Sequence, residues 1–324
     1  MGPAAIIKFV NKRKLSPQTE SLIESGLKNK KLLEQELELI EKYKITLLTF
    51  LDKDYPELLK QIYLPPIVIY CSGAPLKPTA KRIAIVGARK ADSYANNCIS
   101  EIVPNLVKSN WEIVSGGAAG VDGMAHHQTL QNKGTTIAVF GSGLTCPYPS
   151  VNKEMFRTIA RNNGTLISPF PLRTEPCKGN FPARNRIIAG LSQGCLVVQA
   201  AKKSGSLITS QFALDQGRQV FACPGQITNE LSLGCHKLIQ QGAKLVTCSN
   251  DILEEFGESQ ENGLKVTEKK LDPILKHLQE PTSIDELTNK TGLELAELQS
   301  KLFSLQLEGK VSQSITGLWQ SKIF

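Results

Sequence analysis

The 324-residue sequence lacks several features that would place it in a class at once. It has no apolar run near the roughly 20 residues that a membrane-spanning helix needs, and no apolar segment before a cleavage site. Its eight cysteines form no Cys-x-x-Cys pair, and the closest two are twelve residues apart. Because isolated cysteines in apolar runs are typical of buried, reduced thiols, we expect a cytoplasmic protein without a zinc site or a membrane contact.

The short motifs of several enzyme classes are also absent. No Gly-x-x-x-x-Gly-Lys-Ser/Thr loop and no Gly-x-Gly-x-x-Gly fingerprint occurs, which disfavours P-loop NTPases and dinucleotide-dependent enzymes. Ser115 and Ser142 lack the Gly-x-Ser-x-Gly surroundings of a serine hydrolase. His126 and His127 form no His-x-x-x-His pair, so packing is favoured over metal binding. We therefore expect no catalytic residue, no metal and no cofactor.

Positive charge is in excess, and it is unevenly distributed. Lysine and arginine outnumber aspartate and glutamate by 38 to 30, which gives a net charge of +8. Residues 1–80 carry +3, residues 81–256 carry +7, residues 257–268 carry −2, and residues 269–324 carry zero. A basic middle segment suits an anionic partner such as nucleic acid, although a basic balance alone does not establish one.

The pattern of apolar residues divides the chain into four parts. Residues 1–75 form a small segment with helices expected at 19–28 and 32–43. In residues 76–256, short β-branched runs alternate with helix-length stretches, which predicts an extended Rossmann-type, doubly wound α/β domain with a mostly parallel sheet. A polar linker is expected at 257–268. The three short helices and terminal hairpin expected in 269–324 resemble a winged helix.

The central domain contains seven expected strands and five expected helices. The strands are 83–86, 112–115, 136–140, 165–168, 195–199, 219–222 and 244–247. The helices are 94–108, 121–132, 152–163, 184–191 and 207–216. Because ligands of open α/β sheets bind beyond the carboxyl ends of the strands, the residues just after each strand are the place to look for a site.

Two of these strand ends are rich in glycine. Gly87 would allow a close backbone approach to an anion, and Arg89 would supply a fork of donors. The run 115–120 leads into a helix and suits a phosphate or carboxylate. Alternatively, these glycines serve only close packing of helix on strand, and Arg89 faces solvent in a turn. The candidate residues are Gly87, Arg89, Ser115, Gly116, Gly117 and Gly120.

Two further strand ends are basic. The stretch 178–186 places one aromatic residue among cations, a pattern that suits single-stranded nucleic acid through phosphate neutralisation and base stacking. Alternatively, it is a solvated loop over a core phenylalanine. Four ligand-type ends on one sheet edge favour one anion-binding groove. The candidate residues here are Lys178, Phe181, Arg184, Asn185, Arg186, Lys202, Ser204, Gly205 and Ser206.

In order and spacing, these strand-end residues resemble the DNA-processing protein A (DprA/Smf) family. The most specific match is the run Phe-Pro-Ala-Arg-Asn-Arg-Ile-Ile-Ala-Gly-Leu-Ser at 181–192, and the resemblance covers about 65–250. It implies a protein without catalysis that binds single-stranded DNA in the groove and dimerises through the Rossmann-type domain. It also implies that the protein protects incoming DNA and loads RecA recombinase during natural transformation and DNA recombination.

Three positions depart from the family pattern. Ala88 stands where serine is more frequent, and Pro169 and Gln199 stand where the family usually has acids, which disfavours hydrolysis. A second hypothesis is a nucleotide-processing enzyme of the lysine-decarboxylase-like Rossmann group, whose Pro-Gly-Gly-x-Gly-Thr motif is absent here. A third is a regulator that binds duplex DNA through the winged helix, which the zero net charge of 269–324 disfavours.

Overall fold

The structure, a computed structural model, describes residues 18, 25–26, 30–258, 273–278, 280–307, 311–314 and 317–321. The chain divides into two compact units, residues 1–259 and residues 260–324. The division falls within the segment expected to be a linker, of which only residues 257 and 258 are described. The helix expected at 19–28 lies outside the described residues except at 25–26. In the described part of the chain, no helix is long and apolar enough to cross a membrane.

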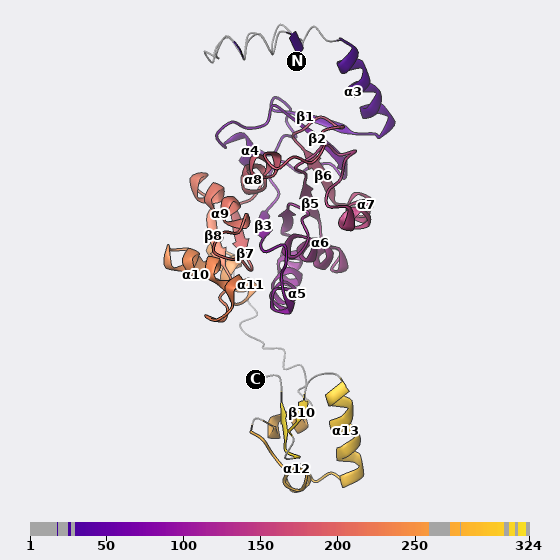
Figure 1. The fold of residues 1–324 in the computed structure, drawn as a ribbon. Coiled ribbons are helices and arrows are strands. Elements are labelled where there is room, and N and C mark those ends of the chain that lie inside the picture. The colour runs from indigo at the N-terminus through magenta and orange to yellow at the C-terminus, as the bar shows by residue number, and fades with distance from the viewer. Residues whose placement is uncertain are drawn as a thin grey trace. The chain divides into compact units, whose positions relative to one another are not determined.

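The first unit is built on a nine-stranded sheet in the order β1-β2-β6-β5-β4-β3-β7-β8-β9 (Figure 1). The strands from β6 to β9 in this order are parallel, and β1 and β2 add an antiparallel edge. The strands are β1 (Thr46–Thr49), β2 (Val68–Gly73), β3 (Arg82–Val86), β4 (Glu112–Ser115), β5 (Thr136–Val139), β6 (Thr165–Ser168), β7 (Gly194–Val197), β8 (Gln219–Ala222) and β9 (Lys244–Leu245). The expected Rossmann-type fold is confirmed, and part of the expected N-terminal segment joins its sheet.

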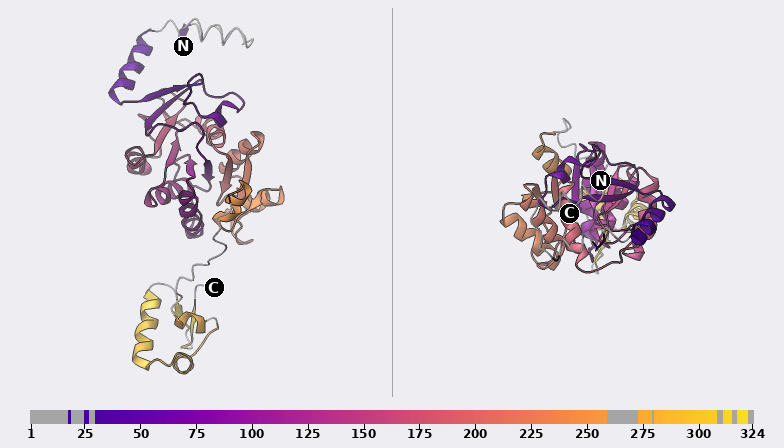
Figure 2. Two further views of the ribbon diagram at one scale, coloured as in Figure 1. Left: turned by 180° about the vertical axis from the view of Figure 1, so that it is seen from behind. Right: turned by 90° about the horizontal axis from the view of Figure 1, so that it is seen from above.

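Helices cover both faces of this sheet (Figures 1 and 2). On β3, Ile83 and Ile85 pack with α5, α6 and α11, whereas Ala84 and Val86 pack with α4, α8, α9 and α10. Neighbouring strand residues point to opposite faces, so β3 is apolar at every position from 83 to 86. The helices are α3 (Lys30–Lys42), α4 (Glu57–Lys60), α5 (Ser93–Lys108), α6 (Val121–Gln131), α7 (Lys153–Arg161), α8 (Asn180–Gly190), α9 (Ser206–Asp215), α10 (Leu233–Gln240) and α11 (Ser249–Glu255).

Two helix starts matter for the sheet edge. Asp92 caps α5, because its carboxylate accepts hydrogen bonds from the amides of Tyr94 and Ala95. Helix α8 begins at Asn180, four residues earlier than expected, with Pro182 in its first turn. Proline is tolerated there because the first amides of a helix have no partner within the helix. As a result, Phe181 is carried by the helix and not by the loop before it.

The second unit has its own apolar core, which includes Leu287, Leu302 and Trp319. Ser283 caps α12 by accepting a hydrogen bond from the amide of Glu286, and Gly292 ends this helix with a left-handed φ of 67°. The described elements are a 3-10 helix (Pro273–His277), α12 (Ile284–Thr291), α13 (Leu295–Leu307), β10 (Val311–Gln313) and β11 (Trp319–Ser321). Helices followed by a terminal hairpin are the elements expected of a winged helix.

Candidate nucleic-acid interface

The order of the sheet reverses at β3, whose neighbours are β4 on one side and β7 on the other. Such a switch point leaves a crevice beyond the strand ends, because the two connecting loops turn away from each other. A cavity of about 600 Å³ lies here, and a smaller one of about 90 Å³ shares Arg89, Ala118, Tyr148, Phe181 and Arg184 with it. We call the two cavities together the strand-end groove.

Arg89 and Lys178 are two of the exposed cations that line the larger cavity. Arg89 follows β3, and Lys178 precedes α8. The guanidinium carbon of Arg89 lies 5.8 Å from the centre of the Phe181 ring, a cation–π distance. Within the described residues, neither cation takes part in an ion pair. Both charges are therefore available to an anionic ligand.

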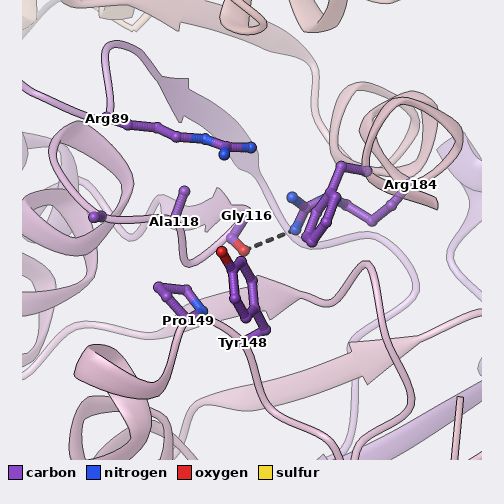
Figure 3. Close-up of a pocket in the computed structure, with 8 residues that line it drawn as sticks. Arg89, Gly116, Ala118, Tyr148, Pro149 and Arg184 are labelled. Atoms are coloured by element: carbon purple, nitrogen blue, oxygen red, sulfur yellow. Dashed lines mark hydrogen bonds between the residues drawn. The ribbon is translucent and has the colours of Figure 1, made fainter. Parts of the chain in front are cut away.

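Arg184 is a buried residue that lines both cavities of the strand-end groove. Only 5% of this residue is exposed, and its Nη1 donates to the carbonyl oxygen of Gly116 at 2.7 Å and to that of Val139. Burial lowers the pKa of Arg184 to about 10, with Asp122 acting in the opposite direction, so the side chain remains a cation at neutral pH. Figure 3 shows the guanidinium groups of Arg89 and Arg184 entering the pocket from opposite sides.

The glycine loop after β4 is held in place by the buried carboxylate of Asp122. Oδ2 of Asp122 accepts hydrogen bonds from the amides of Gly116 at 3.2 Å and Ala118 at 3.3 Å. Burial raises the pKa of this carboxyl, and Arg184 opposes that shift. The two amides are therefore engaged by the protein's own carboxylate, so the positive groups facing the groove are side chains rather than this backbone nest.

The other residues of the same loop serve packing. The hydroxyl of Ser115 is buried and donates to the carbonyl of Ile85 at 2.6 Å. Gly117 and Gly120 have φ values of 69° and 80°, which side chains rarely adopt. A Cβ on Gly120 would also lie 2.2 Å from the carbonyl oxygen of Ala88. These three residues shape the loop without lining either cavity.

Two aromatic rings stand in the groove. Phe181, at the start of α8, is half-buried, and its ring centre lies 5.6 Å from that of Tyr148. Tyr148 is 48% exposed and belongs to the loop after β5 (Figure 3). Sequence reasoning did not select Tyr148 as a site residue, although an aromatic residue after β5, a fifth strand that ends at the same sheet edge, was a usable signal.

The groove gathers most of the predicted site residues. Arg186 lies elsewhere, because its Nη1 donates to the backbone carbonyls of Tyr63 and Leu64. Lys202 is exposed but lines neither cavity. Lys90 and Thr209 line the larger cavity and were not predicted. The predicted residues that line one or both cavities are Gly87, Arg89, Gly116, Lys178, Phe181, Arg184, Asn185, Ser204, Gly205 and Ser206.

Two side chains considered in the sequence analysis, those of His126 and Gln199, form hydrogen bonds within the protein. Burial lowers the pKa of His126 to about 3, and Nδ1 of this histidine lies 2.7 Å from Oγ1 of Thr136. Nε2 of Gln199 donates to Asp92, the α5 cap, at 2.8 Å. A glutamate at this position would bring a second carboxylate to Asp92. In the described part of the chain, no cluster of histidine, cysteine, aspartate or glutamate residues suits a metal ion.

Comparison with protein-family models gives two matches. Residues 46–257 match DNA recombination-mediator protein A, and residues 261–314 match the DprA winged helix domain. The first match contains the whole groove, and the second lies within the second unit. The winged-helix expectation is therefore confirmed.

Curated relatives and solved structures agree with these matches. The chain is 44% identical over 207 residues to DNA processing protein DprA of Bacillus subtilis, covering 64% of this chain and 69% of the relative. The structure of DprA from Streptococcus pneumoniae has a TM-score of 0.66 and 36% identity, covering 78% of this chain and 92% of that one. The structure from Helicobacter pylori has a TM-score of 0.60 and 28% identity, covering 66% and 96%. The chain thus belongs to the DNA recombination-mediator protein A (DprA/Smf) family.

Proposed function

We propose that this protein is a single-stranded DNA-binding recombination mediator and that the strand-end groove holds the strand. One observation carries the proposal: exposed Arg89 and Lys178 line the same cavity as the rings of Phe181 and Tyr148. Cations neutralise phosphates and aromatic rings stack on unpaired bases, a combination that binds single strands without reading their sequence. The solved structure of the Helicobacter pylori relative was reported for its single-stranded DNA binding mode, which supports this assignment.

The proposed role is that of a mediator and not of an enzyme. In the cytoplasm, the protein would protect incoming DNA and load RecA recombinase onto it during natural transformation and DNA recombination. The acidic residue that lines the groove, Asp122, accepts hydrogen bonds from two loop amides and is nine-tenths buried. A carboxylate committed in this way is poorly placed as a general base, which speaks against the alternative of a nucleotide-processing enzyme.

We also propose that the protein is a homodimer formed through the first unit. Strand β9 ends the sheet, and Leu245 on this strand is 44% exposed. Leu233 at the start of α10 is 40% exposed. An open sheet edge with apolar side chains favours association with another chain. Leu245→Glu together with Leu233→Glu should shift the sedimentation equilibrium from dimer to monomer, and an unchanged dimer would contradict the proposed surface.

Photo-crosslinking tests where the strand lies. Full-length protein is mixed with an oligonucleotide that carries 5-iodouracil, irradiated and digested, and the linked peptides are identified by mass spectrometry. Links to Phe181 or Tyr148 support the groove, because this chemistry couples a base to an aromatic ring that it touches. Links confined to residues outside the groove would overturn it. The Phe181→Leu variant is the matched control, since it keeps an apolar side chain but removes the ring.

RecA loading needs its own assay. On single-stranded DNA coated with single-strand-binding protein, RecA hydrolyses ATP only after it has nucleated. We expect this protein to shorten the lag before hydrolysis and Arg89→Ala to restore it. An unchanged lag with wild-type protein would reject RecA loading while leaving DNA binding intact.

A separate assay tests the alternative of a nucleotide-processing enzyme. Incubation of the protein with nucleoside monophosphates should release no free base, and release of base would favour that enzyme.

A further inference from the structure

A second cavity of about 350 Å³ lies beside the strand-end groove. Its apolar lining includes Ile45, Phe140, Phe156 and Leu166. Phe140 and Phe156 are each 2% exposed, and their ring centres lie 4.7 Å apart. This volume is within the roughly 300–1,000 Å³ of small-molecule sites. The Phe140 and Phe156 rings are tilted by 59° and form the buried apolar floor of the cavity, whereas the ring of Tyr43, which also lines it, is 49% exposed and offers a face to a flat ring.

Two cations stand at the rim of this cavity. Lys153 and Arg157 are both exposed and lie four residues apart on α7, so they project from the same side of the helix. Arg157 also donates to Glu154 at 2.9 Å, but the two side chains are 55% and 72% exposed. Such an exposed pair is weak and easily exchanged for a phosphate. Among the residues that the structure describes, no acidic side chain lines the cavity.

One loop connects this cavity to the groove. Tyr148 and Pro149 line the groove, whereas Leu144, Thr145 and Pro147 line the second cavity. The loop after β4, whose Gly116 and Ala118 line the groove, also packs against Phe156 of this cavity, because a Cβ on Gly117 would lie 2.5 Å from the Phe156 ring. A DNA strand that leaves the groove over Tyr148 would therefore meet the second cavity with its following nucleotides.

We propose that this cavity binds one nucleotide, with the base in its apolar part against the Tyr43 ring and the phosphate between Lys153 and Arg157. The inference rests on the proposed function, since the nucleotide is assigned to the same strand that fills the groove. A free mononucleotide carries the same base and phosphate and would fit the same cavity. The experiment must therefore distinguish it from a nucleotide of the bound strand. In either case, the site recognises an aromatic base joined to a phosphate.

The first test compares two double variants on labelled oligo-dT of increasing length, measured by fluorescence anisotropy. Lys153→Ala with Arg157→Ala removes the rim. Lys53→Ala with Lys108→Ala is the control, because it removes the same charge from exposed positions that line none of the cavities. Wild type and control should gain affinity stepwise once the strand is long enough to reach the cavity. The rim variant should lose that step and keep the affinity for shorter strands, and its salt slope on long strands should fall by roughly 0.7 for the one lost phosphate contact.

The second test addresses the apolar part of the cavity. Ala160 lines it from α7, and Ala160→Phe would fill it while leaving both rim cations in place. This variant should lose the same length-dependent step as the rim variant. Circular dichroism would check that its helix content is unchanged. If Ala160→Phe fails to fold, the rim variant still decides the matter.

Titration with dTMP shows whether the ligand of this cavity is a nucleotide of the bound strand or a free mononucleotide. Loss of the length-dependent step in the rim variant supports the strand as the source, whereas loss of dTMP binding with unchanged oligonucleotide binding supports a free mononucleotide. The inference is overturned if neither the step nor dTMP binding changes while oligo-dT binding still depends on Arg89. If Arg89→Ala leaves binding unchanged at every length, the proposed function fails instead, and dTMP binding still tests this cavity.

Discussion

The two units of this chain differ in how their cations are held. In the strand-end groove, Arg89 and Lys178 are exposed and outside any ion pair of the described residues. On the helices of the winged-helix unit, Lys290 lies 3.4 Å from Glu286, and Lys301 lies 2.8 Å from Glu297. The sheet segment 81–256 carries +7 and the segment 269–324 carries zero. The segment that contains the winged-helix unit thus has no net positive charge, and the first unit is expected to provide the main DNA affinity.

The largest expected effect is on stability and comes from Arg184→Leu. This change leaves the carbonyls of Gly116 and Val139 without their donor and the buried carboxylate of Asp122 without its nearby cation. We expect a loss of about 3–5 kcal/mol in the free energy of unfolding, measured by chemical denaturation at neutral pH. Arg161→Leu, an exposed change on α7, should stay within about 0.5 kcal/mol.

The same variant should change how stability depends on pH. Burial raises the pKa of Asp122, and Arg184 opposes this shift, so removing Arg184 raises the pKa further. A carboxyl whose folded-state pKa is raised contributes stability that is present at low pH and is lost as pH rises through that pKa. Relative to wild type, Arg184→Leu should therefore recover part of its deficit between neutral and mildly acidic pH. A deficit that is constant or grows on acidification would contradict the role of Asp122.

The next effect is on DNA affinity and comes from Arg89→Ala together with Lys178→Ala. If each side chain neutralises one phosphate, the slope of log affinity against log salt should fall by about 1.4, at roughly 0.7 per contact on a single strand. Anisotropy of labelled oligo-dT over a salt series measures it. The control is Lys53→Ala with Lys108→Ala, and an equal fall in that control would mean that total charge, not the groove, binds the strand.

A smaller effect is expected from Phe181→Leu. Loss of the ring should remove a base contact of about 1–3 kcal/mol and weaken oligo-dT binding roughly tenfold. Because no charge is removed, the salt slope should stay the same, which separates stacking from phosphate contact. Phe181→Trp should retain most of the affinity. If Phe181→Leu binds as tightly as wild type, Phe181 is a packing residue and Tyr148 must carry any stacking.

The smallest effect is expected in the winged-helix unit. Lys290→Ala with Lys301→Ala should change oligo-dT affinity less than twofold, because the segment 269–324 has no net positive charge to attract a phosphate chain. Each helix pair contributes only about 0.2–0.5 kcal/mol, so the unfolding midpoint should also change little. A loss of affinity comparable to that of the groove variant, under the same salt conditions, would reverse the comparison between the units.

The fold was largely predictable because its signals are local. Each expected strand of the central domain overlaps an observed one, since buried parallel strands are short apolar runs between turn residues. The hairpin-like edge of β1 and β2 was less evident, because its pairing with β6 joins residues about 100 positions apart. Such distant pairing leaves no local pattern in a single sequence.

The site was predicted as a region more accurately than as individual side chains. Arg184 and Arg186 are two residues apart on α8, so they project from nearly opposite sides of the helix, and only Arg184 lines the groove. Similarly, the glycine loop that contains Gly116 and Ala118 was expected to bind an anionic ligand, but the amides of these two residues donate to the carboxylate of Asp122. Which partner a group takes depends on side-chain geometry that residue spacing does not specify.

The most direct test of the account compares oligo-dT with a matched duplex, using full-length wild type and Arg89→Ala at two salt concentrations. We predict preference for the single strand, an affinity that falls steeply with salt, and loss of that preference in Arg89→Ala. Equal or stronger binding of the duplex, unaffected by Arg89→Ala, would contradict the assignment of the strand-end groove to single-stranded DNA.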